Sequence, residues 1–341
     1  MTKKIAINGF GRIGRNAFKI AFEQRDDIEV VAINDLFSPA QLAHLLKYDS
    51  TYGIWEHNVS SDDENIIVDG KKFHLTAIRD PRELPWKELG IDVVIESTGL
   101  FVDPAKARAH IDAGAKKVIL SAPAKGEGSK TIVLGVNDGE LEESFAKFDI
   151  FNNASCTTNC IAPVMKVIED NFGVQKAFMN TTHSYTSDQR LLDAPHKDER
   201  RMRSAAMNII PTSTGASIAA TEAIPSLKGK FGGSSLRVPT PVVSIANMTV
   251  LIKRTTTKEE INDIFRKAAQ EKYFAGILDA TDEKLVSSDF IGNSHSSTVD
   301  LDSTAVVDGD LINVVSWYDN EWGYSNRLVE MTADIAKLTN D

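Results

Sequence analysis

The sequence predicts an α/β protein of two domains, a doubly wound parallel sheet followed by an α+β unit with a mixed or antiparallel sheet. Its 341 residues suffice for two cores, because a domain takes roughly 100–200 residues. Short Ile- and Val-rich runs alternate with helical spacing in the first half, whereas the second half carries longer strand-like stretches. We therefore expect domains at 1–154 and 155–320, with a C-terminal helix, about 321–341, that packs back on the first domain.

The first domain begins with a strand–helix–strand unit. Apolar runs at Lys4–Asn8 and Glu29–Ile33 predict two strands, and apolar residues at helical spacing over Arg12–Phe22 predict the helix between them. Further strands are expected at Asp92–Ser97, Lys117–Ser121, Thr131–Val136 and Asp149–Asn152, with a helix opening on Asp103-Pro104 between the first two. Strands that alternate with helices imply a parallel sheet. Asp69-Gly70, between two alternating runs within Asn65–Thr76, instead predicts a hairpin near the sheet edge.

The second domain has a different pattern. A helix is expected over Thr157–Ile168, loosened by Pro163, and long strand-like stretches follow at Val174–His183, Leu236–Lys253 and Leu311–Trp317. Thr257 and Glu260 match a capping box that opens a helix to about Gln270, and Glu321–Leu338 is helical in period. Ser184–Asn208 shows no clear periodicity and is rich in Arg and Lys. A loop of this length is usually functional or disordered, although a solvated charged surface loop is the alternative.

Composition excludes several classes of protein. With 42% hydrophobic residues and no apolar run of the roughly 20 residues that span a bilayer, we expect no membrane insertion. The N-terminus has no apolar signal region, and the only two cysteines, Cys156 and Cys160, suit a reduced compartment, so a cytoplasmic protein is expected. A net charge of −10 disfavours nucleic-acid binding. Neither the histidines nor the cysteines have the spacing of a metal site.

A glycine-rich turn follows the first predicted strand. Gly9, Gly11 and Gly14 form a G-x-G-x-x-G pattern that ends that strand and opens the first helix. In this context the glycines allow a tight turn and close approach of a pyrophosphate to the helix N-terminus, which is typical of a Rossmann dinucleotide-binding domain. The alternative is a tight turn with no ligand. Asp35, after the second strand, suits hydrogen bonds to the adenine ribose and would repel a 2′-phosphate, although Asp is also a common turn residue.

Cys156 lies where the last parallel strand meets a helix. The free N–H groups of a helix N-terminus stabilise a thiolate and can hold an oxyanion, so this position suits a nucleophile. A thiolate that attacks an aldehyde gives a hemithioacetal, which becomes a thioester when a dinucleotide accepts a hydride. His183 is the best base among seven histidines, because it ends a strand and leads into the cationic loop. Taken alone, a strand-end histidine is more often a hydrogen-bonded structural residue.

At these residues the chain resembles the phosphorylating glyceraldehyde-3-phosphate dehydrogenases along essentially its whole length. The resemblance rests on INGFGRIGR at the start, ASCTTNC around Cys156, HSYTSDQRLLDAPHKD from His183, IIPTSTGA, LRVPTPVVS and WYDNEWGYSNR, in the order of the family. It implies NAD-dependent oxidation of glyceraldehyde 3-phosphate with inorganic phosphate, through a thioester on Cys156. It also implies a homotetramer, in which the loop Ser184–Asn208 packs against a neighbouring subunit.

The resemblance implies a role for each matching position. Cys156 would be the nucleophile and His183 the proton-transfer group. The residues implied to bind the substrate phosphate and inorganic phosphate are Ser155, Thr157, Thr186, Arg201, Thr214, Gly215 and Arg237. Those implied to bind NAD, besides the three glycines, are Arg12, Ile13, Asp35, Arg79, Ser121 and Asn320, the last at the nicotinamide carboxamide.

The chain departs from the family at one cofactor position. NAD-selective members usually carry Leu-Pro in the long loop, where this chain has Ala194-Pro195. Because Asp35 and Pro195 remain, we expect NAD preference with weak use of NADP. Erythrose-4-phosphate dehydrogenases share the cysteine motif, but the intact Thr214-Gly215 pair favours the phosphorylating three-carbon enzyme. A semialdehyde dehydrogenase is the other enzymatic alternative, and a cofactor-binding interaction protein that has lost catalysis is the alternative of a different class.

Overall fold

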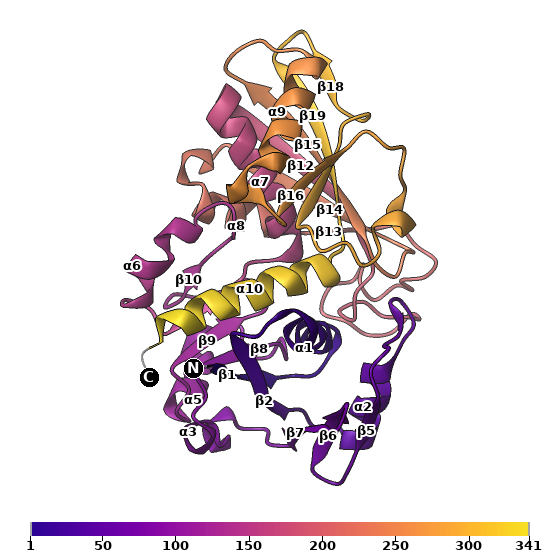
Figure 1. Cartoon of the computed structure of the whole chain (residues 1–341). Coiled ribbons are helices and arrows are strands. Elements are labelled where there is room, and N and C mark those ends of the chain that lie inside the picture. The colour runs from indigo at the N-terminus through magenta and orange to yellow at the C-terminus, as the bar shows by residue number, and fades with distance from the viewer. Residues whose placement is uncertain (1, 340–341) are drawn as a thin grey trace. The chain divides into compact units, whose positions relative to one another are not determined.

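The computed structural model describes residues 2–339, which divide into two compact units. The first contains residues 2–132, 138–154 and 325–339, and the second contains 133–137 and 155–324. Figure 1 labels their elements. One unit has a mostly parallel sheet and the other a mixed sheet, which confirms the predicted fold class. Residues 1 and 340–341, at the ends of the predicted first domain and C-terminal helix, lie outside the described residues.

The first unit is built on a nine-stranded sheet in the order β10-β11-β9-β8-β1-β2-β7-β6-β5. Neighbouring strands are parallel from β10 to β7 and antiparallel from β7 to β5. The strands are β1 (Lys3–Asn8), β2 (Ile28–Asn34), β5 (Val59–Ser61), β6 (Asn65–Val68), β7 (Lys71–Thr76), β8 (Val93–Glu96), β9 (Lys117–Leu120), β10 (Lys130–Thr131) and β11 (Ile150–Asn152). β8 and β9 are buried at every position, as expected for central strands of a parallel sheet covered on both faces.

The helices of this unit are mostly short. They are α1 (Arg12–Gln24), α2 (Pro39–Lys47), α3 (Trp86–Leu89), α4 (Pro104–Ala107), α5 (Ala109–Asp112), α6 (Leu141–Phe145) and, from residue 325 on, α10 (Trp322–Leu338). A small ribbon pairs β3 (Tyr48–Asp49) with β4 (Gly53–Ile54). Thr339, after α10, accepts a hydrogen bond from Lys3 Nζ (2.7 Å) and donates one to Asp92 (3.2 Å). The predicted hairpin is formed by β6 and β7, with Asp69 and Gly70 at φ 49° and 84°.

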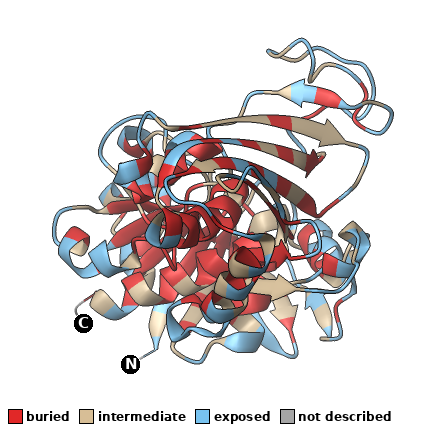
Figure 2. Ribbon diagram, turned by 90° about the horizontal axis from the view of Figure 1, so that it is seen from above, coloured by how far each residue is buried: buried red, intermediate tan, exposed pale blue. Residues whose placement is uncertain are grey.

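The second unit is built on a mixed eight-stranded sheet in the order β13-β14-β12-β15-β19-β17-β16, with β18 beside β19. Its strands are β12 (Val174–Ser184), β13 (Ile210–Thr212), β14 (Phe231–Val238), β15 (Ser244–Ile252), β16 (Leu278–Thr281), β17 (Ser297–Asp300), β18 (Ala305–Val307) and β19 (Leu311–Tyr318). Its α-helices are α7 (Cys156–Phe172), α8 (Ala216–Ala223) and α9 (Lys258–Gln270). α7 packs on β15, β17 and β19, so one sheet face is covered. Buried and exposed residues alternate along these strands in Figure 2.

Two predicted strands are wrong in extent. Of Thr131–Val136, only Thr131 is in a strand. Val133–Asn137 forms a turn in which Val136 N donates to Val133 O (3.0 Å) and Val133 N donates to the Asn137 side chain (2.8 Å). The stretch Leu236–Lys253 is divided into β14 and β15, because Pro239 and Pro241 have no N–H to continue a ladder.

The predicted capping box is half correct. Thr257 caps α9 by accepting a hydrogen bond from Glu260 N (3.2 Å). The Glu260 carboxylate accepts a hydrogen bond from Thr256 Oγ1 (2.6 Å) and pairs with Arg254. Its partners are therefore other side chains rather than the backbone of the cap residue.

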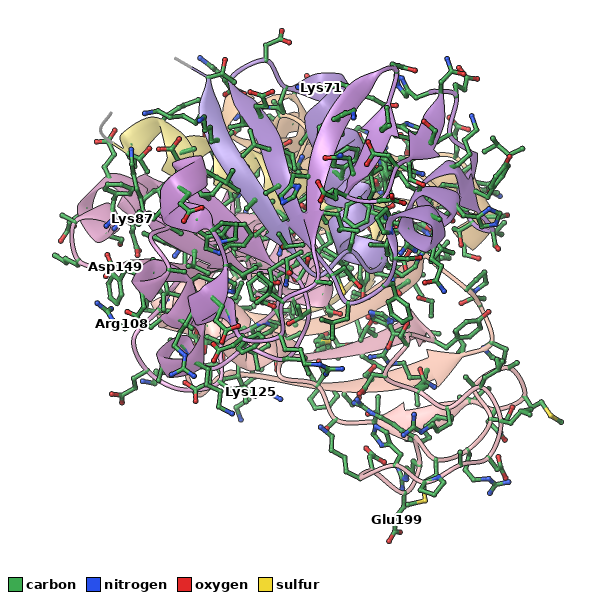
Figure 3. All side chains as sticks on the ribbon, turned by 90° about the horizontal axis from the view of Figure 1, so that it is seen from below. Lys71, Lys87, Arg108, Lys125, Asp149 and Glu199 are labelled. Carbon is green, nitrogen blue, oxygen red and sulfur yellow. The ribbon has the colours of Figure 1, made fainter. Side chains whose placement is uncertain are left out.

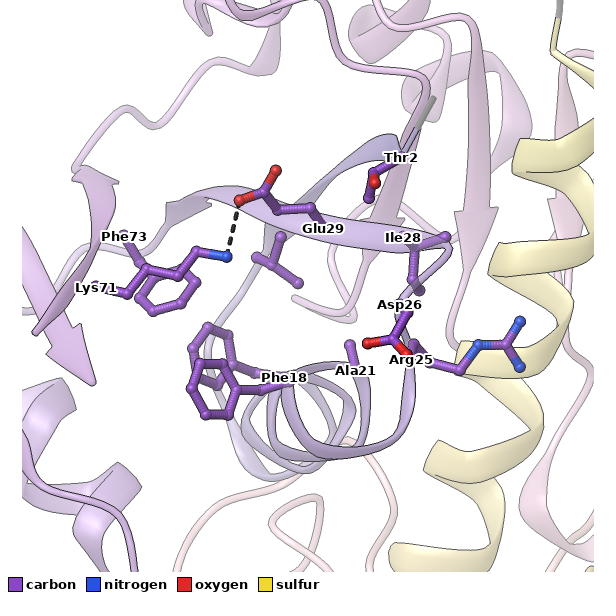
Figure 4. Close-up of a pocket in the computed structure, with 11 residues that line it drawn as sticks. Thr2, Phe18, Ala21, Arg25, Asp26, Ile28, Glu29, Lys71 and Phe73 are labelled. Atoms are coloured by element: carbon purple, nitrogen blue, oxygen red, sulfur yellow. Dashed lines mark ion pairs between the residues drawn. The ribbon is translucent and has the colours of Figure 1, made fainter. Parts of the chain in front are cut away.

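A pocket of about 350 Å³ lies between α1, the start of β2 and the start of β7 (Figure 4). Phe18, Ile28 and Phe73 form its apolar floor, and the ion pair between Lys71 and Glu29 (2.8 Å) spans its rim. None of the predicted site residues lines it. In the described part of the chain, no helix is long and apolar enough to cross a membrane, and no cluster of His, Cys, Asp and Glu side chains has the arrangement of a metal site.

Candidate active site

A pocket of about 310 Å³ in the first unit is lined by residues at the carboxyl ends of β1, β2 and β8. Ligands of open parallel sheets bind at this edge. Four predicted cofactor residues line the pocket, namely Gly9, Gly11, Asp35 and Arg79. Thr98, Leu100 and Phe101 form another part of the wall.

The three glycines of the motif meet different steric demands. A Cβ on Gly9, which has φ +91°, would lie 2.6 Å from Thr98 N, and a Cβ on Gly14 would lie 2.1 Å from the Gly9 carbonyl oxygen. A Cβ on Gly11 would meet nothing within 4 Å. Gly11 is also the N-cap of α1, and no side chain caps this helix. Open space beside an uncapped helix N-terminus fits a pyrophosphate, so these residues fit a dinucleotide.

Asp35 is fixed in the pocket by two backbone groups. Its Oδ2 accepts a hydrogen bond from Phe10 N (2.7 Å), and its Oδ1 accepts one from Phe37 N (3.2 Å). Because each carboxylate oxygen has two lone pairs, both oxygens retain the capacity to accept from a ribose hydroxyl. The negative charge would repel a 2′-phosphate at the same place.

The remaining predicted cofactor residues do not line this pocket. Arg12 forms an ion pair with Asp49 (2.5 Å) and lies over the Tyr52 ring, 5.5 Å from its centroid. Ile13 is half-buried in the first turn of α1. Ser121 follows β9, and its N donates to Glu96 O (2.9 Å). All three residues belong to the same unit as Asp35.

Asn320 belongs to the second unit and is buried. Its Oδ1 accepts hydrogen bonds from Ser184 Oγ (2.9 Å) and Ser244 Oγ (3.0 Å). These two bonds fix the side-chain amide so that Nδ2 is the group that can donate to a ligand.

Cys156 and His183 meet within the second unit. Cys156 is the first residue of α7, and His183 is the second-last residue of β12. Cys156 Sγ lies 3.5 Å from His183 Nε2, which is within hydrogen-bonding distance for sulfur. Ser155 caps α7 by accepting a hydrogen bond from Thr158 N (3.0 Å), so the helix starts at the thiol.

The contacts of His183 Nδ1 determine its tautomer. Nδ1 lies 2.7 Å from Ser184 O and 3.0 Å from Arg237 Nη1. A carbonyl can only accept, and Arg237 Nη1 also donates to that carbonyl (3.0 Å), so we assign the proton to Nδ1. Nε2 then presents its lone pair to the thiol. Burial, followed by the charge of Arg237, lowers the pKa of His183 from 6.5 to about 3, so the free imidazole is neutral near pH 7.

Two opposing effects act on the Cys156 thiol. Burial raises its pKa, whereas the positive charge of Arg237 and the N–H of Thr157 lower it. Burial is the larger effect, so the resting pair is a neutral thiol beside a neutral imidazole. The thiol proton can therefore move to Nε2 while the sulfur forms its bond, without a preformed ion pair.

Arg237 connects the cysteine pair with the predicted anion site. Its Nη1 lies 3.4 Å from Thr186 Oγ1, and its Nε has no hydrogen-bond partner among residues 2–339. Arg201 is close enough to lower the pKa of Arg237, although burial of Arg237 is the larger cause. Arg201 donates to Thr212 Oγ1 and pairs with Asp188. Guanidinium groups with unused donors are suited to bind phosphate oxygens.

The other predicted anion-binding residues lie at the starts of α7 and α8. Gly215 is the N-cap of α8, and Thr214 Oγ1 accepts a hydrogen bond from Ala216 N (3.1 Å). Thr158 Oγ1 donates to Ala216 O (3.2 Å), which connects the first turns of the two helices. Two neighbouring helix N-termini favour an anion between them.

Sequence reasoning missed Tyr318 and Asp188. The Tyr318 hydroxyl lies 2.9 Å from both Thr157 Oγ1 and Thr181 Oγ1, and its ring meets His183 edge to face at 6.0 Å. Burial raises its pKa, so it remains a neutral phenol. Asp188 pairs with Arg201 in the loop after β12, whose outer part is marked by Glu199 in Figure 3. Both residues lie in motifs that the sequence analysis used, Tyr318 in WYDNEWGYSNR and Asp188 in HSYTSDQRLLDAPHKD, so motif membership could have identified them.

The family comparisons cover both units. Residues 3–104 match the NAD binding domain of glyceraldehyde 3-phosphate dehydrogenase, and residues 155–320 match its C-terminal domain. The chain is 54% identical over 340 residues to glyceraldehyde-3-phosphate dehydrogenase of Borreliella burgdorferi, covering 98% of this chain and 100% of that protein. The chain belongs to the glyceraldehyde-3-phosphate dehydrogenase family.

Further members of the family match equally broadly. Identity is 51% to glyceraldehyde-3-phosphate dehydrogenase 1 of Bacillus subtilis, over 99% of both chains. It is also 51% to the enzyme of Streptomyces coelicolor, over 97% of this chain and 98% of that one. The family predicted from the sequence motifs is confirmed, and with it an NAD-dependent oxidoreductase.

Proposed function

We propose that the protein oxidises glyceraldehyde 3-phosphate with NAD and inorganic phosphate to 1,3-bisphosphoglycerate, as in glycolysis and gluconeogenesis. The observation that carries this proposal is the 3.5 Å approach of Cys156 Sγ to His183 Nε2 beside the guanidinium of Arg237. A nucleophile, a base and a cation that binds phosphate are the groups that this reaction requires.

The first step is attack of the Cys156 sulfur on the aldehyde carbon. His183 Nε2 takes the thiol proton as the S–C bond forms and passes it to the carbonyl oxygen, which becomes the hydroxyl of a hemithioacetal. Free N–H groups of the first turn of α7, which begins at Cys156, would stabilise the charge that develops on that oxygen. When bound, NAD supplies the hydride acceptor. His183 accepts the hydroxyl proton during oxidation, which leaves a thioester on Cys156.

The second step is attack of an inorganic phosphate oxygen on the thioester carbon. The C–S bond breaks, the acyl phosphate leaves, and the departing sulfur takes the proton that His183 accepted during the oxidation, so the Cys156 thiol and the neutral imidazole are both regenerated. We assign the substrate phosphate to Thr186 and Arg237, and the attacking phosphate to Ser155, Thr157, Thr214 and Gly215, with Arg201 nearby. The proximity of Arg237 to Thr186, and of the α7 and α8 N-termini, supports a site for two anions.

For NAD we assign the adenosine half to the pocket with Gly9, Gly11, Asp35 and Arg79, whose shape and charge support it. Arg12, Ile13, Gly14 and Ser121 would support this half, and Asn320 Nδ2 would hold the nicotinamide carboxamide. The alternative functions are those of the related erythrose-4-phosphate and semialdehyde dehydrogenases. Turnover measured with erythrose 4-phosphate and with a semialdehyde distinguishes them from the proposed function.

We further propose a cytoplasmic homotetramer. Both cysteines are free thiols, which suits a reducing compartment. Phe178, Val307 and Leu311 expose apolar surface on the sheet of the second unit, and Leu191 and Leu192 do so in the long loop. Exposed apolar patches of this kind are typical of subunit interfaces. Sedimentation of the purified protein tests the tetramer directly.

The test is NADH formation with glyceraldehyde 3-phosphate, with and without inorganic phosphate, and with NADP in a parallel reaction. Turnover that requires phosphate and prefers NAD is expected. Turnover that is indifferent to phosphate, or faster with erythrose 4-phosphate or a semialdehyde, would overturn the proposal. Cys156→Ser is expected to lose turnover and retain NAD binding, whereas Cys160→Ala, which alters a buried thiol beyond the first turn of α7, is the matched control.

A further inference from the structure

Glu96 and His110 form a buried pair that the proposed reaction does not use. Glu96 ends β8 and His110 is in α5. The exposed fractions of these residues are 3% and 0%, and His110 Nε2 lies 3.0 Å from Glu96 Oε2. A buried carboxylate is costly unless hydrogen bonds satisfy it, so its surroundings indicate what it organises.

Trp86 fixes the tautomer of His110. The indole Nε1–H, which can only donate, lies 3.0 Å from His110 Nδ1. Nδ1 is therefore the acceptor, and the imidazole carries its proton on Nε2, directed at Glu96. Asn8 Nδ2 donates to the same carboxylate oxygen (2.5 Å). The Oε2 side of Glu96 thus holds one histidine and one asparagine.

The other oxygen of Glu96 organises the next turn of the chain. Oε1 accepts hydrogen bonds from Thr98 N (2.8 Å) and from Thr98 Oγ1. Thr98 Oγ1 in turn accepts a hydrogen bond from Leu100 N (3.0 Å). The carboxylate has therefore received four donors, which is about its full capacity, and the segment 98–100 is connected to it through Thr98.

The contacts on both sides of the Glu96 carboxylate lead to the dinucleotide pocket, through Asn8 on one side and through Thr98 on the other. Asn8, Thr98 and Leu100 all line it. Asn8 Oδ1 accepts from Asn34 Nδ2 (2.7 Å), and Asn34 also lines the pocket. The chain of contacts from Trp86 through His110 and Glu96 thus ends at two walls of the pocket, one at Asn8 and one at Thr98.

We propose that Glu96 and His110 are positioning residues for the adenosine half of NAD. They touch no ligand themselves, and they hold Asn8 and the Thr98–Phe101 wall in the shape that receives it. The inference rests on the proposed NAD site. In Glu96→Gln, one oxygen becomes an NH2 group that faces donors, so either the Thr98 side or the Asn8 side loses its acceptor.

The experiment compares dissociation constants for NAD and for ADP-ribose in the wild type and Glu96→Gln. Both constants are expected to rise by the same factor, roughly tenfold. The kcat at saturating NAD is expected to stay within about twofold, because the nicotinamide and cysteine groups are unchanged. Trp86→Phe keeps an aromatic side chain, although a smaller one, and removes the donor to His110. A smaller rise in the same two constants is expected. It replaces Glu96→Gln if that variant does not fold.

Val94→Ala is the matched control, since Val94 is a fully buried residue of β8 that does not line the pocket. It is expected to lower the melting temperature and leave both constants unchanged. Unchanged constants in folded Glu96→Gln and Trp86→Phe, or an equal rise in Val94→Ala, would overturn the inference. Failure of the wild type to bind NAD would instead overturn the proposed function, so the two failures are distinguishable.

Discussion

His183 Nδ1 and the carbonyl oxygen of Ser184 lie 2.7 Å apart, and this bond within one dipeptide sets the direction in which the imidazole acts. Arg237 donates to the same carbonyl (3.0 Å) and reinforces the arrangement from the neighbouring strand β14. With Nδ1 as the donor, the lone pair of Nε2 faces Cys156. The Ser184 carbonyl and Arg237 thus orient the imidazole so that Nε2 can accept the thiol proton, although neither takes up a proton itself.

Replacing His183 by Asn should remove that base without removing the nucleophile. We expect kcat/KM to fall by about 10²–10⁴, the usual contribution of a general base. The rate of alkylation of Cys156 by iodoacetamide at pH 7 should fall as well, because the thiol proton has no acceptor. His57→Asn, on the surface of the other unit, is the control. Unchanged alkylation and turnover in His183→Asn would contradict the assigned role.

The pH dependence of stability should carry the signature of the same histidine. The pKa of His183 is lowered from 6.5 to about 3 in the folded chain, so below pH 6.5 the unfolded chain binds a proton that the folded chain does not. Stability from this group is therefore complete above pH 6.5 and is lost as the pH falls toward 3.

From pH 7 to pH 5 this linkage amounts to about 2 kcal/mol per chain. Urea unfolding of wild type and His183→Asn at the two pH values measures it, because effects of the other titrating groups cancel between the proteins. The wild type should lose more stability than the variant. Equal losses would show that folding does not lower the pKa of His183.

Asp35 should control the choice between NAD and NADP. Its carboxylate lies in the pocket and carries the charge that a 2′-phosphate would meet. In Asp35→Ser we expect the ratio of kcat/KM for NAD to that for NADP to fall by at least tenfold, through a lower KM for NADP and a higher KM for NAD. Glu88→Gln removes one exposed charge from the same unit and is the control. A ratio that does not change would place the adenine ribose elsewhere.

The sequence predicted the parts of the site that depend on local chain geometry. Cys156 was expected at a helix start because a strand-like run ends just before it and helical spacing follows, and α7 does begin there. The approach of Arg237 to His183 depends instead on the parallel pairing of β12 with β14. Such pairing is a tertiary property, and no pattern within either strand specifies its register.

The errors have similar causes. Val133–Asn137 is apolar enough to be buried but turns at Gly135 (φ 75°), because side-chain and turn hydrogen bonds replace the ladder. Tyr318 was missed because its contacts with Thr157 and Thr181 unite three elements that are distant in sequence. The pattern of apolar residues predicts which segments are buried, but it does not predict which group a buried polar side chain will bond to.

Gly11 and Gly14 offer a final test, since one substitution has opposite consequences at the two positions. A Cβ at Gly14 would lie 2.1 Å from Gly9 O, a backbone atom that cannot move cheaply. Gly14→Ala should therefore destabilise the protein by about 1–3 kcal/mol or more. A Cβ at Gly11 meets nothing within 4 Å, and φ −74° is open to any residue. Gly11→Ala should lower the melting temperature much less than Gly14→Ala, since it causes no clash and only replaces the N-cap glycine of α1. It should weaken NAD binding, because the methyl group enters the space assigned to the pyrophosphate. Thermal unfolding and NAD titration of both variants decide this, and a Gly11→Ala protein with unaltered affinity would show that the pyrophosphate does not approach this turn.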